Sequence, residues 1–373
     1  MKFQCEKYVL DAAVATASRA AAAKSPVTAL EGLLLEASLE GGIRITGYDL
    51  KKGIYSDIPA DVSEAGNIVL PAKIFGDIVR KLPDGIVSLY ADKNNSTHIN
   101  CGKADYDIMG SDGADFPDLP DMEEHTTDLF IRQDRFGQMI RETAFAISDN
   151  ESRPIYTGEL IECNQGRVTM VALDGYRLAI RRENAESCSE ESCSVIVPGS
   201  ALSDVEKLCT SEEDSVRISV GLKHVCFKLN RTTLISRKLE GEFLDYHKAV
   251  PEKISIPLKA QRTELIRCAD RVSLIIDDRS KNPLRFRFGS GNVNFCSATL
   301  LGRAEANGIL EGDGRNTVLG LNNGYLLQAL KAAPADKLLI NIKDSNSPIV
   351  FLPEDESDGF AYMILPIRLR AEE

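Results

Sequence analysis

Few side chains in this sequence are placed to do chemistry together, and the densest group is Asp174, Tyr176 and Arg177 in the segment DGYRL. A carboxylate, a phenol and a guanidinium so close together could act as acid, base and anion binder in a cleft. Asp174 and Arg177 could equally form a structural ion pair. The sequence has no P-loop, no G-x-S-x-G segment and no histidine pair with metal-ligand spacing. An enzyme that uses these three residues is therefore one interpretation, and no other motif supports it.

The cysteines favour a reducing compartment and no metal site. Nine cysteines occur without the spacing of a disulfide framework, which is typical of a cytosolic protein. Cys188 and Cys193 lie in the polar stretch ESCSEESCS, at the edge of zinc-ligand spacing, and no histidine pair follows them. We therefore expect a surface loop there, and no cofactor or metal. The sequence also shows no signal peptide and no apolar run long enough to span a membrane, so we expect a cytoplasmic protein.

One sequence pattern occurs three times and sets the expected architecture. Its copies are NIVLPAKIFGDIVRKL (residues 67–82), SVIVPGSALSDVEKL (194–208) and NTVLGLNNGYLLQAL (316–330). Each copy joins a β-branched run, a Pro or Gly break and a helical stretch, and an alternating strand pattern follows. The copies are roughly 125 residues apart, which is the usual size of a domain rather than of a solenoid repeat.

Each repeat is expected to contain helix, strands, helix and strands. Residues 7–21, 133–147 and 262–276 place apolar side chains at helical spacing. Glycines at 41–42 and at 289–291 suggest hairpin turns. Strand runs with only two helices per repeat indicate an α+β fold with antiparallel sheets. We predict three such domains, at residues 1–123, 128–250 and 253–373.

The charge pattern limits how this chain could bind nucleic acid. A net charge of −12 argues against binding over the whole surface. Helical projection nevertheless places six basic residues opposite the apolar stripes, and three acidic residues share those helix backs. A locally basic face and ordinary solvated helices therefore both remain open. The basic residues are Arg19, Lys73, Arg80, Arg141, Arg267 and Arg271; the acidic ones are Asp77, Glu142 and Asp204.

Several segments carry a family resemblance that covers essentially the whole chain. The tripled domain is accompanied by FAISDNESRPI (residues 145–155), VALDGYRLAIRR (171–182), KLEGEFLDY (238–246) and YMILPIRL (362–369). In this order and spacing they resemble the bacterial DNA polymerase III β subunit, the sliding-clamp family. The resemblance implies three DNA-clamp domains, and a head-to-tail homodimer that closes as a ring around duplex DNA, with the helices lining the hole. It also implies a non-catalytic processivity factor whose clients, the replicative polymerase and the clamp loader among them, bind through linear peptide motifs.

A ring explains how an acidic protein could work on DNA. Topology prevents escape, so weak electrostatics that do not depend on sequence suffice, whereas tight phosphate contacts would slow sliding. The family carries over three sets of residues. For the client-peptide pocket it implies Tyr156, Leu173, Gly175, Tyr176, Arg177, Leu178, Leu244, Ala249, Asn322, Tyr325, Pro348, Met363, Leu365, Pro366, Ile367 and Arg368. For the DNA-facing surface it implies Lys24, Lys73, Asn150, Arg153 and Pro154, and for the dimer interface Tyr106, Ile108, Leu274 and Ile275.

The chain departs from the family pattern at two places. Leu173 and Leu244 stand where the pocket often has a smaller hydroxyl residue and a proline, and residues 370–373 extend past the usual end. We expect the peptide motif to be accepted with altered affinity. Two other readings stay open: a three-domain cytosolic enzyme, and a monomeric peptide-binding scaffold that has lost the ring. The apolar Ile108 and Leu274 favour the ring over the scaffold.

Overall fold

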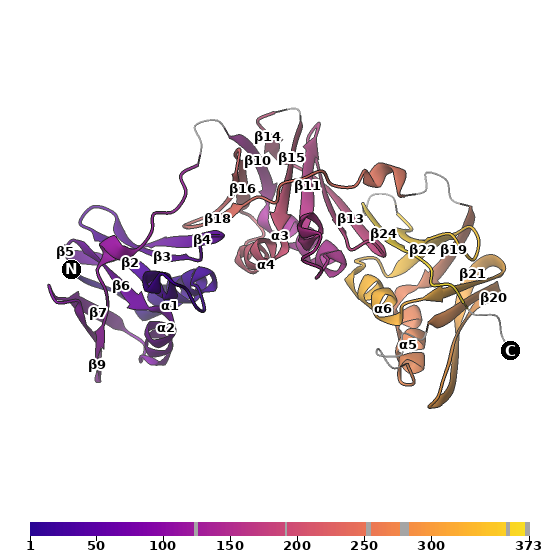
Figure 1. Cartoon of the computed structure of the whole chain (residues 1–373), viewed down its shortest axis with the longest axis horizontal. Coiled ribbons are helices and arrows are strands. Elements are labelled where there is room, and N and C mark those ends of the chain that lie inside the picture. The colour runs from indigo at the N-terminus through magenta and orange to yellow at the C-terminus, as the bar shows by residue number, and fades with distance from the viewer. Residues whose placement is uncertain (123–125, 191, 251–254, 277–282, 356–358, 370–373) are drawn as a thin grey trace. The chain divides into compact units, whose positions relative to one another are not determined.

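The computed structural model describes residues 1–122, 126–190, 192–250, 255–276, 283–355 and 359–369 (Figure 1). The chain divides into two compact units. Unit 1 comprises Met1–Asp134, Glu186–Glu190 and Ala201–Lys238, and unit 2 comprises Arg135–Ala185, Glu191–Ser200 and Leu239–Glu373. The predicted α+β class is confirmed, because every strand pair in the described residues is antiparallel and six α-helices accompany the sheets.

Unit 1 contains two sheets. One has five strands in the order β5-β1-β7-β8-β9, and the other has nine in the order β14-β10-β16-β17-β18-β4-β3-β2-β6. The nine-stranded sheet joins two repeats, since β18 pairs with β4 with Leu234 opposite Ile54. The bounds are β1 Lys2–Glu6, β2 Gly32–Ser38, β3 Gly42–Tyr48, β4 Lys52–Ile58, β5 Asp61–Glu64, β6 Gly66–Pro71, β7 Ile86–Ala91, β8 Ser96–Cys101, β9 Ala104–Met109, β10 Thr127–Arg132, β14 Ser187–Cys188, β16 Ser215–Val220, β17 His224–Leu229 and β18 Thr232–Arg237.

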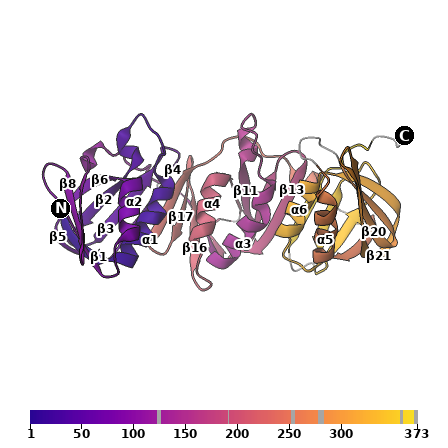
Figure 2. The same cartoon turned by 90° about the horizontal axis from the view of Figure 1, so that it is seen from below.

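The helices α1 (Lys7–Ala17) and α2 (Ala72–Lys81) lie side by side in unit 1 and share one apolar core with the sheets (Figure 2). The predicted helix over residues 7–21 is too long. The Ser18 hydroxyl donates to the Val14 carbonyl at 2.6 Å, which ends the helical ladder, and a short 3₁₀ turn follows. A Cβ on Gly47 would lie 2.1 Å from the Ala17 carbonyl oxygen, so this glycine lets β3 approach the helix end.

Unit 2 is built on one sheet of ten strands in the order β15-β11-β12-β13-β24-β23-β22-β19-β21-β20. This sheet also joins two repeats, since β13 pairs with β24, with Leu178 opposite Met363 and Ile180 opposite Ala361. The bounds are β11 Gly158–Asn164, β12 Arg167–Leu173, β13 Arg177–Asn184, β15 Ser192–Pro198, β19 Ile256–Gln261, β20 Leu284–Thr299, β21 Gly302–Leu321, β22 Lys337–Ile342, β23 Ile349–Pro353 and β24 Phe360–Ile364. The helices α5 Arg262–Ser273 and α6 Asn323–Ala332 belong to unit 2, as does most of α3 Gln133–Thr143, whereas α4 Gly199–Leu208 belongs mostly to unit 1.

Two local predictions in unit 2 are wrong. Residues 289–291 do not form a hairpin turn; they shift the register within β20, where Gly291 has φ +76°, and the turn comes at residues 300–301. Cys188 and Cys193 do not lie in a loop. Cys188 belongs to β14 opposite Leu129, and Cys193 belongs to β15 opposite Cys163. Strand pairing with partners distant in sequence overrides the polar composition of that stretch.

Candidate partner-binding and nucleic-acid-facing surfaces

One face of β13 carries an apolar cluster that contains part of the predicted pocket. We call it the β13 cluster. Side chains alternate between the faces of a strand, so Leu178 and Ile180 leave the sheet on the same side. The linker segment that contains Tyr246 packs over them. The buried members are Leu160, Val171, Leu173, Leu178, Ile180, Ile196, Tyr246, Val350, Ala361 and Met363, and Ile155, Tyr156, Leu239, Phe243, Ala249, Val250 and Leu352 pack against them.

Five predicted pocket residues meet in this cluster: Tyr156, Leu173, Leu178, Ala249 and Met363. Leu173 is a buried core residue on β12 opposite Leu178, so its extra bulk relative to the family pattern is absorbed by packing. The other pocket residues from the linker and the third repeat, Leu244, Pro348, Pro366 and Arg368, are not members of the β13 cluster. Residues 370–373 lie outside the described part of the chain.

Arg177 lies on the opposite face of β13 and is held by its own chain. Its guanidinium Nε donates to Asp174 Oδ2 at 3.0 Å. The guanidinium group lies over the ring of Tyr325, with Cζ 4.2 Å from the ring centroid. A second guanidinium nitrogen donates to Gln328 on α6. Asp174 Oδ1 accepts the backbone N–H groups of Tyr176 and Arg177 at 2.8 and 3.0 Å. Asp174 and Arg177 are thus the structural ion pair that the sequence left open, and they fix the turn before β13.

This turn displays apolar and aromatic surface beside α6. Tyr176 is 63% exposed, and its ring centroid lies 6.5 Å from that of Tyr325. The Tyr176 carbonyl accepts the N–H of Leu365 at 2.8 Å, and Ile367 donates to the Gly320 carbonyl at 2.7 Å. Leu365 and Ile367 are both exposed. At the start of α6, Asn322 Oδ1 accepts the Tyr325 N–H at 3.2 Å and caps the helix. Gly175, at φ +93°, permits the turn.

The predicted DNA-facing residues are all exposed. Lys24 follows the first helix and Lys73 lies in the first turn of α2. Asn150, Arg153 and Pro154 lie in the loop after α3. There Asn150 Oδ1 accepts the Ser152 N–H at 3.0 Å, and the Asn150 carbonyl accepts the Arg153 N–H at 3.2 Å. This turn fixes the backbone that carries the exposed Arg153 side chain.

Two of the three acidic residues expected on exposed helix backs are buried instead. In unit 1, Asp204 on α4 pairs with Lys52 on β4, and Arg19 and Lys207 lie 3.8 and 3.9 Å from the same carboxylate. In unit 2, Glu142 pairs with Arg181 at 2.9 Å. Helical projection cannot reveal these contacts because the partners come from distant strands. The exposed helix surface therefore carries two fewer negative charges than the helical projection indicates. The Asp204 carboxylate faces three cations.

A buried carboxyl group that the sequence did not reveal lies behind α3. Glu159 on β11 is fully buried, and its Oε2 lies 2.6 Å from the Thr143 hydroxyl. Burial raises the pKa of Glu159 to about 8, against which the Thr143 contact acts only weakly. The only sequence signal is a single glutamate at the start of an apolar strand.

The predicted interface residues lie at two places. Tyr106 and Ile108 belong to β9, the end strand of the five-stranded sheet. Leu274 follows α5 and is 84% exposed, and Ile275 is half-buried beside it. Beside β9, His98 lies 3.1 Å from Asp105 and 3.0 Å from Asp107, and its hydrogen bond with Asp107 raises the pKa of its imidazole.

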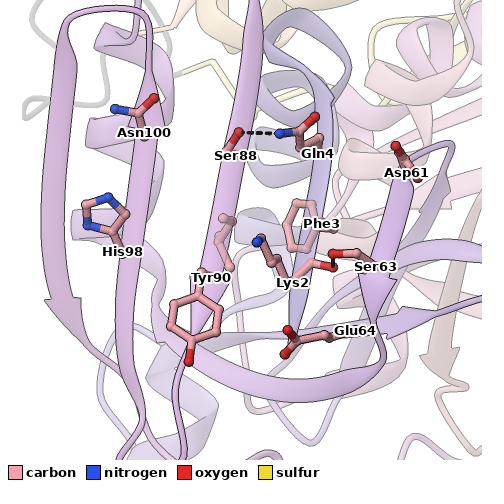
Figure 3. Close-up of a pocket in the computed structure, with 11 residues that line it drawn as sticks. Lys2, Phe3, Gln4, Asp61, Ser63, Glu64, Ser88, Tyr90, His98 and Asn100 are labelled. Atoms are coloured by element: carbon pink, nitrogen blue, oxygen red, sulfur yellow. Dashed lines mark hydrogen bonds between the residues drawn. The ribbon is translucent and has the colours of Figure 1, made fainter.

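A polar groove of about 740 Å³ crosses the same five-stranded sheet (Figure 3). Lys2, Tyr90 and His98 are cross-strand neighbours on β1, β7 and β8, and Gln4 donates to Ser88 at 3.0 Å beside them. The groove combines both charge signs with one exposed aromatic ring. In the described part of the chain, no group of His, Cys, Asp and Glu residues could hold a metal ion, and no helix there is long and apolar enough to cross a membrane.

Comparison with known proteins covers the whole chain. The N-terminal, central and C-terminal domain models of the DNA polymerase III beta subunit match residues 1–120, 130–245 and 247–368. A beta sliding clamp from Synechocystis sp. is 30% identical, across 99% of this chain and 100% of its own length. The beta sliding clamp of Staphylococcus aureus is 29% identical across 94% of each.

Solved structures agree with this assignment. The DNA polymerase sliding clamp of Bacillus subtilis has a TM-score of 0.92 at 27% identity, and the DNA polymerase III beta subunit of Pseudomonas aeruginosa has 0.91 at 25%. Each comparison covers 99% of this chain and 100% of the other. The predicted resemblance is confirmed, and the chain belongs to the DNA polymerase III beta subunit family of sliding clamps.

Proposed function

We propose that this chain is a DNA polymerase processivity factor that encircles duplex DNA and tethers the replicative polymerase and other clients. The observation that carries this proposal is the succession of three beta-subunit domain matches along the chain, in the order of the threefold sequence pattern. Its three domains would span residues 1–123, 128–250 and 253–373. In this role the protein is a non-catalytic, cytoplasmic accessory subunit and needs no cofactor.

The ring would form from two chains that meet head to tail. The unpaired edge of β9, with Tyr106 and Ile108, would meet the end of α5 at Leu274 and Ile275 in the second chain. An unpaired strand edge and a highly exposed leucine are the features that such a contact would cover. This contact joins two different patches, and it closes a ring only if the rotation between the chains fits.

The inner surface would contact DNA weakly. Lys24, Lys73, Asn150, Arg153 and Pro154 would lie near the phosphates. Burial and pairing of Glu142 and Asp204 support this assignment, since they reduce the negative charge of the helix surface. A few exposed cations would hold DNA loosely enough to slide, because each additional phosphate contact adds affinity and salt dependence.

Clients would bind at the β13 cluster and the adjoining surface formed by Tyr176, Tyr325, Leu365 and Ile367. An extended peptide with aliphatic and aromatic anchors suits such a surface, where a few polar groups at the rim fix its orientation. A fluorescent pentapeptide with these anchors should bind saturably, and absence of saturation at high micromolar protein would exclude this pocket.

The ring itself is tested by solution mass and by retention on DNA. Light scattering at micromolar concentration should give twice the chain mass of 40.8 kDa. After loading by a clamp loader, the protein should stay on nicked circular DNA and slide off the same DNA once it is linearised. A monomer, or equal loss from both DNAs, would favour the peptide-binding scaffold and reopen the enzyme interpretation.

A further inference from the structure

At the margin of the β13 cluster lies Arg182, an arginine that pairs with no anion in the described part of the chain. Leu178, Ile180 and Arg182 are alternate residues of β13, so their side chains leave the same face of the sheet. The first two are buried members of the cluster, and Arg182 is half-buried beyond them. With a rise of about 3.3 Å per residue, Arg182 lies roughly 13 Å along the strand from Leu178.

The neighbours of Arg182 make its site electropositive. Thr169 lies opposite it on β12, and Arg167 is two residues from Thr169 on the same face. Burial lowers the pKa of Arg182; Tyr246 opposes this, and the charge of Arg167 adds a smaller lowering effect. The Tyr246 hydroxyl donates to Glu162 Oε2 at 2.7 Å, so that carboxylate is already engaged. Within the part of the chain that the structure describes, the Arg182 guanidinium makes no hydrogen bond or ion pair.

The adjacent Arg181, unlike Arg182, is paired with carboxylates. Arg181 points to the other face of β13, where it pairs with Glu142 at 2.9 Å and with Glu183 at 2.5 Å. A partly desolvated guanidinium without such an anion is unfavourable, because burial removes its hydration and nothing replaces it. The planar guanidinium matches the two oxygens of a carboxylate. Arg182 is therefore in the state that an entering anion would stabilise.

The local charge balance favours a carboxylate. Among the residues that the structure describes, two positive charges from Arg167 and Arg182, less one negative charge from Glu162, leave a net charge of +1 around the site. A single carboxylate neutralises this charge, whereas a phosphate dianion would leave an excess negative charge beside Glu162. The continuity of β13 places such an anion on the same peptide that the apolar cluster binds.

Building on the proposed client site, we propose that Arg182, supported by Arg167, binds an aspartate or glutamate of the partner peptide. That residue would lie about four positions from the apolar anchor held at Leu178, as the strand distance requires for an extended peptide. The clamp would thereby select, among peptides with similar anchors, those with an acidic flank.

Fluorescence anisotropy with three kinds of peptide tests this. The core peptide carries only the aliphatic and aromatic anchors; the others extend it by four residues ending in Glu or in Gln, at either end. For the wild-type protein, one Glu extension should bind roughly ten-fold tighter than its Gln counterpart, with the advantage fading at high salt. Arg182→Gln should abolish the advantage and Arg182→Lys should keep part of it. Arg44→Gln removes the same charge from unit 1 and should leave the advantage intact.

The possible outcomes test the role of Arg182 separately from the client site on which it depends. Equal affinities for Glu and Gln extensions, with normal binding of the core peptide, would overturn the role of Arg182 and leave the client site standing. A loss of unfolding stability in Arg182→Gln with an unchanged Glu advantage would also overturn it, and would assign Arg182 to the fold. Failure of the core peptide to bind at all would refute the client site on which the inference rests.

Discussion

Replacing Glu159 by glutamine should change how the stability of this protein depends on pH. The Thr143 hydroxyl has one proton and two close acceptors, the Met139 carbonyl at 2.8 Å and Glu159 Oε2 at 2.6 Å, with the Ile140 carbonyl farther away at 3.5 Å. Both contacts are satisfied together if Glu159 is protonated and donates to Thr143, which in turn donates to Met139. A glutamine can donate in the same way through its amide, so Glu159→Gln keeps this chain of hydrogen bonds and removes the titration.

The magnitude follows from the pKa values. The pKa of Glu159 is about 8 in the native protein and 4.5 in the reference state. A carboxyl group with a raised native pKa binds more protons in the folded than in the unfolded chain, so stability falls as pH rises from 4.5 towards 8. Between pH 6 and pH 8 this one group should lower the free energy of unfolding by about 2 kcal/mol. Its second oxygen, Oε1, has no hydrogen-bond partner among the described residues, and the extra amide hydrogen of glutamine costs about 1 kcal/mol at every pH.

Urea unfolding at pH 6 and pH 8, followed by circular dichroism, provides the assay. The wild type has already lost about 2 kcal/mol by pH 6, which exceeds the cost of the glutamine, so Glu159→Gln should be about 1 kcal/mol more stable than the wild type at pH 6 and about 3 kcal/mol more stable at pH 8. Glu240→Gln, at an exposed glutamate, serves as the control and should keep the wild-type pH dependence. Parallel pH dependence of the wild type and Glu159→Gln would refute the argument that Glu159 is protonated in the native state.

Three further substitutions test other parts of the structure. Asp204→Asn leaves Lys52 partly buried without its anion, so the free energy of unfolding should fall by about 3 kcal/mol. Retention on circular DNA should become more resistant to salt, because Lys52, Arg19 and Lys207 lose the carboxylate that neutralises them. Unchanged values in urea unfolding and in salt titration would contradict this prediction. Leu274→Asp should convert the dimer to a monomer by light scattering, since it places a charge at the proposed contact, and an unchanged mass would remove Leu274 from the interface. Tyr176→Ala should weaken client-peptide binding several-fold with less than about 0.5 kcal/mol change in stability, because its side chain is mostly exposed; unchanged binding by anisotropy would exclude Tyr176 from the pocket.

Local pattern was a reliable guide where a segment's neighbours in sequence decide its structure. The strands β7, β16 and β22 follow the three helical stretches where the alternating pattern predicts a strand, because alternation reflects one buried face. The helices α2, α4 and α6 likewise follow the Pro or Gly break of each repeat. The two acidic residues that were wrongly placed on exposed helix surface share a cause. Asp204 looked exposed on its own helix, but it lies against Lys52 from a strand about 150 residues away in sequence, and no helical projection contains that partner.

The candidate sites divide in the same way. The segment around Arg177 and Leu178 could be recognised from sequence, yet the sequence left open whether Arg177 binds Asp174 or a ligand. The structure shows the ion pair, because the alternation of β13 turns Arg177 toward Asp174 and Tyr325 while Leu178 enters the apolar cluster; a contact between Arg177 and a client stays a prediction. The sequence does not distinguish Arg182 from the adjacent Arg181. The structure distinguishes them, because Glu142 and Glu183 pair with Arg181, and no carboxylate of the described residues pairs with Arg182.

By itself, the sequence determined the threefold repeat, the α+β class and the family, since these reside in local periodicity and in the order of motifs. The predicted order of elements within each repeat was incomplete, because the strands β1, β10 and β19 precede the first helix of each repeat. The tertiary structure decided which strands join the repeats, β18 to β4 and β13 to β24, and which charges are buried, as at Glu159, Glu142 and Asp204. The strands that join the repeats are more than a hundred positions apart in sequence, and the cost of burying a charge is set by the partner that folding brings to it, as Lys52 is brought to Asp204.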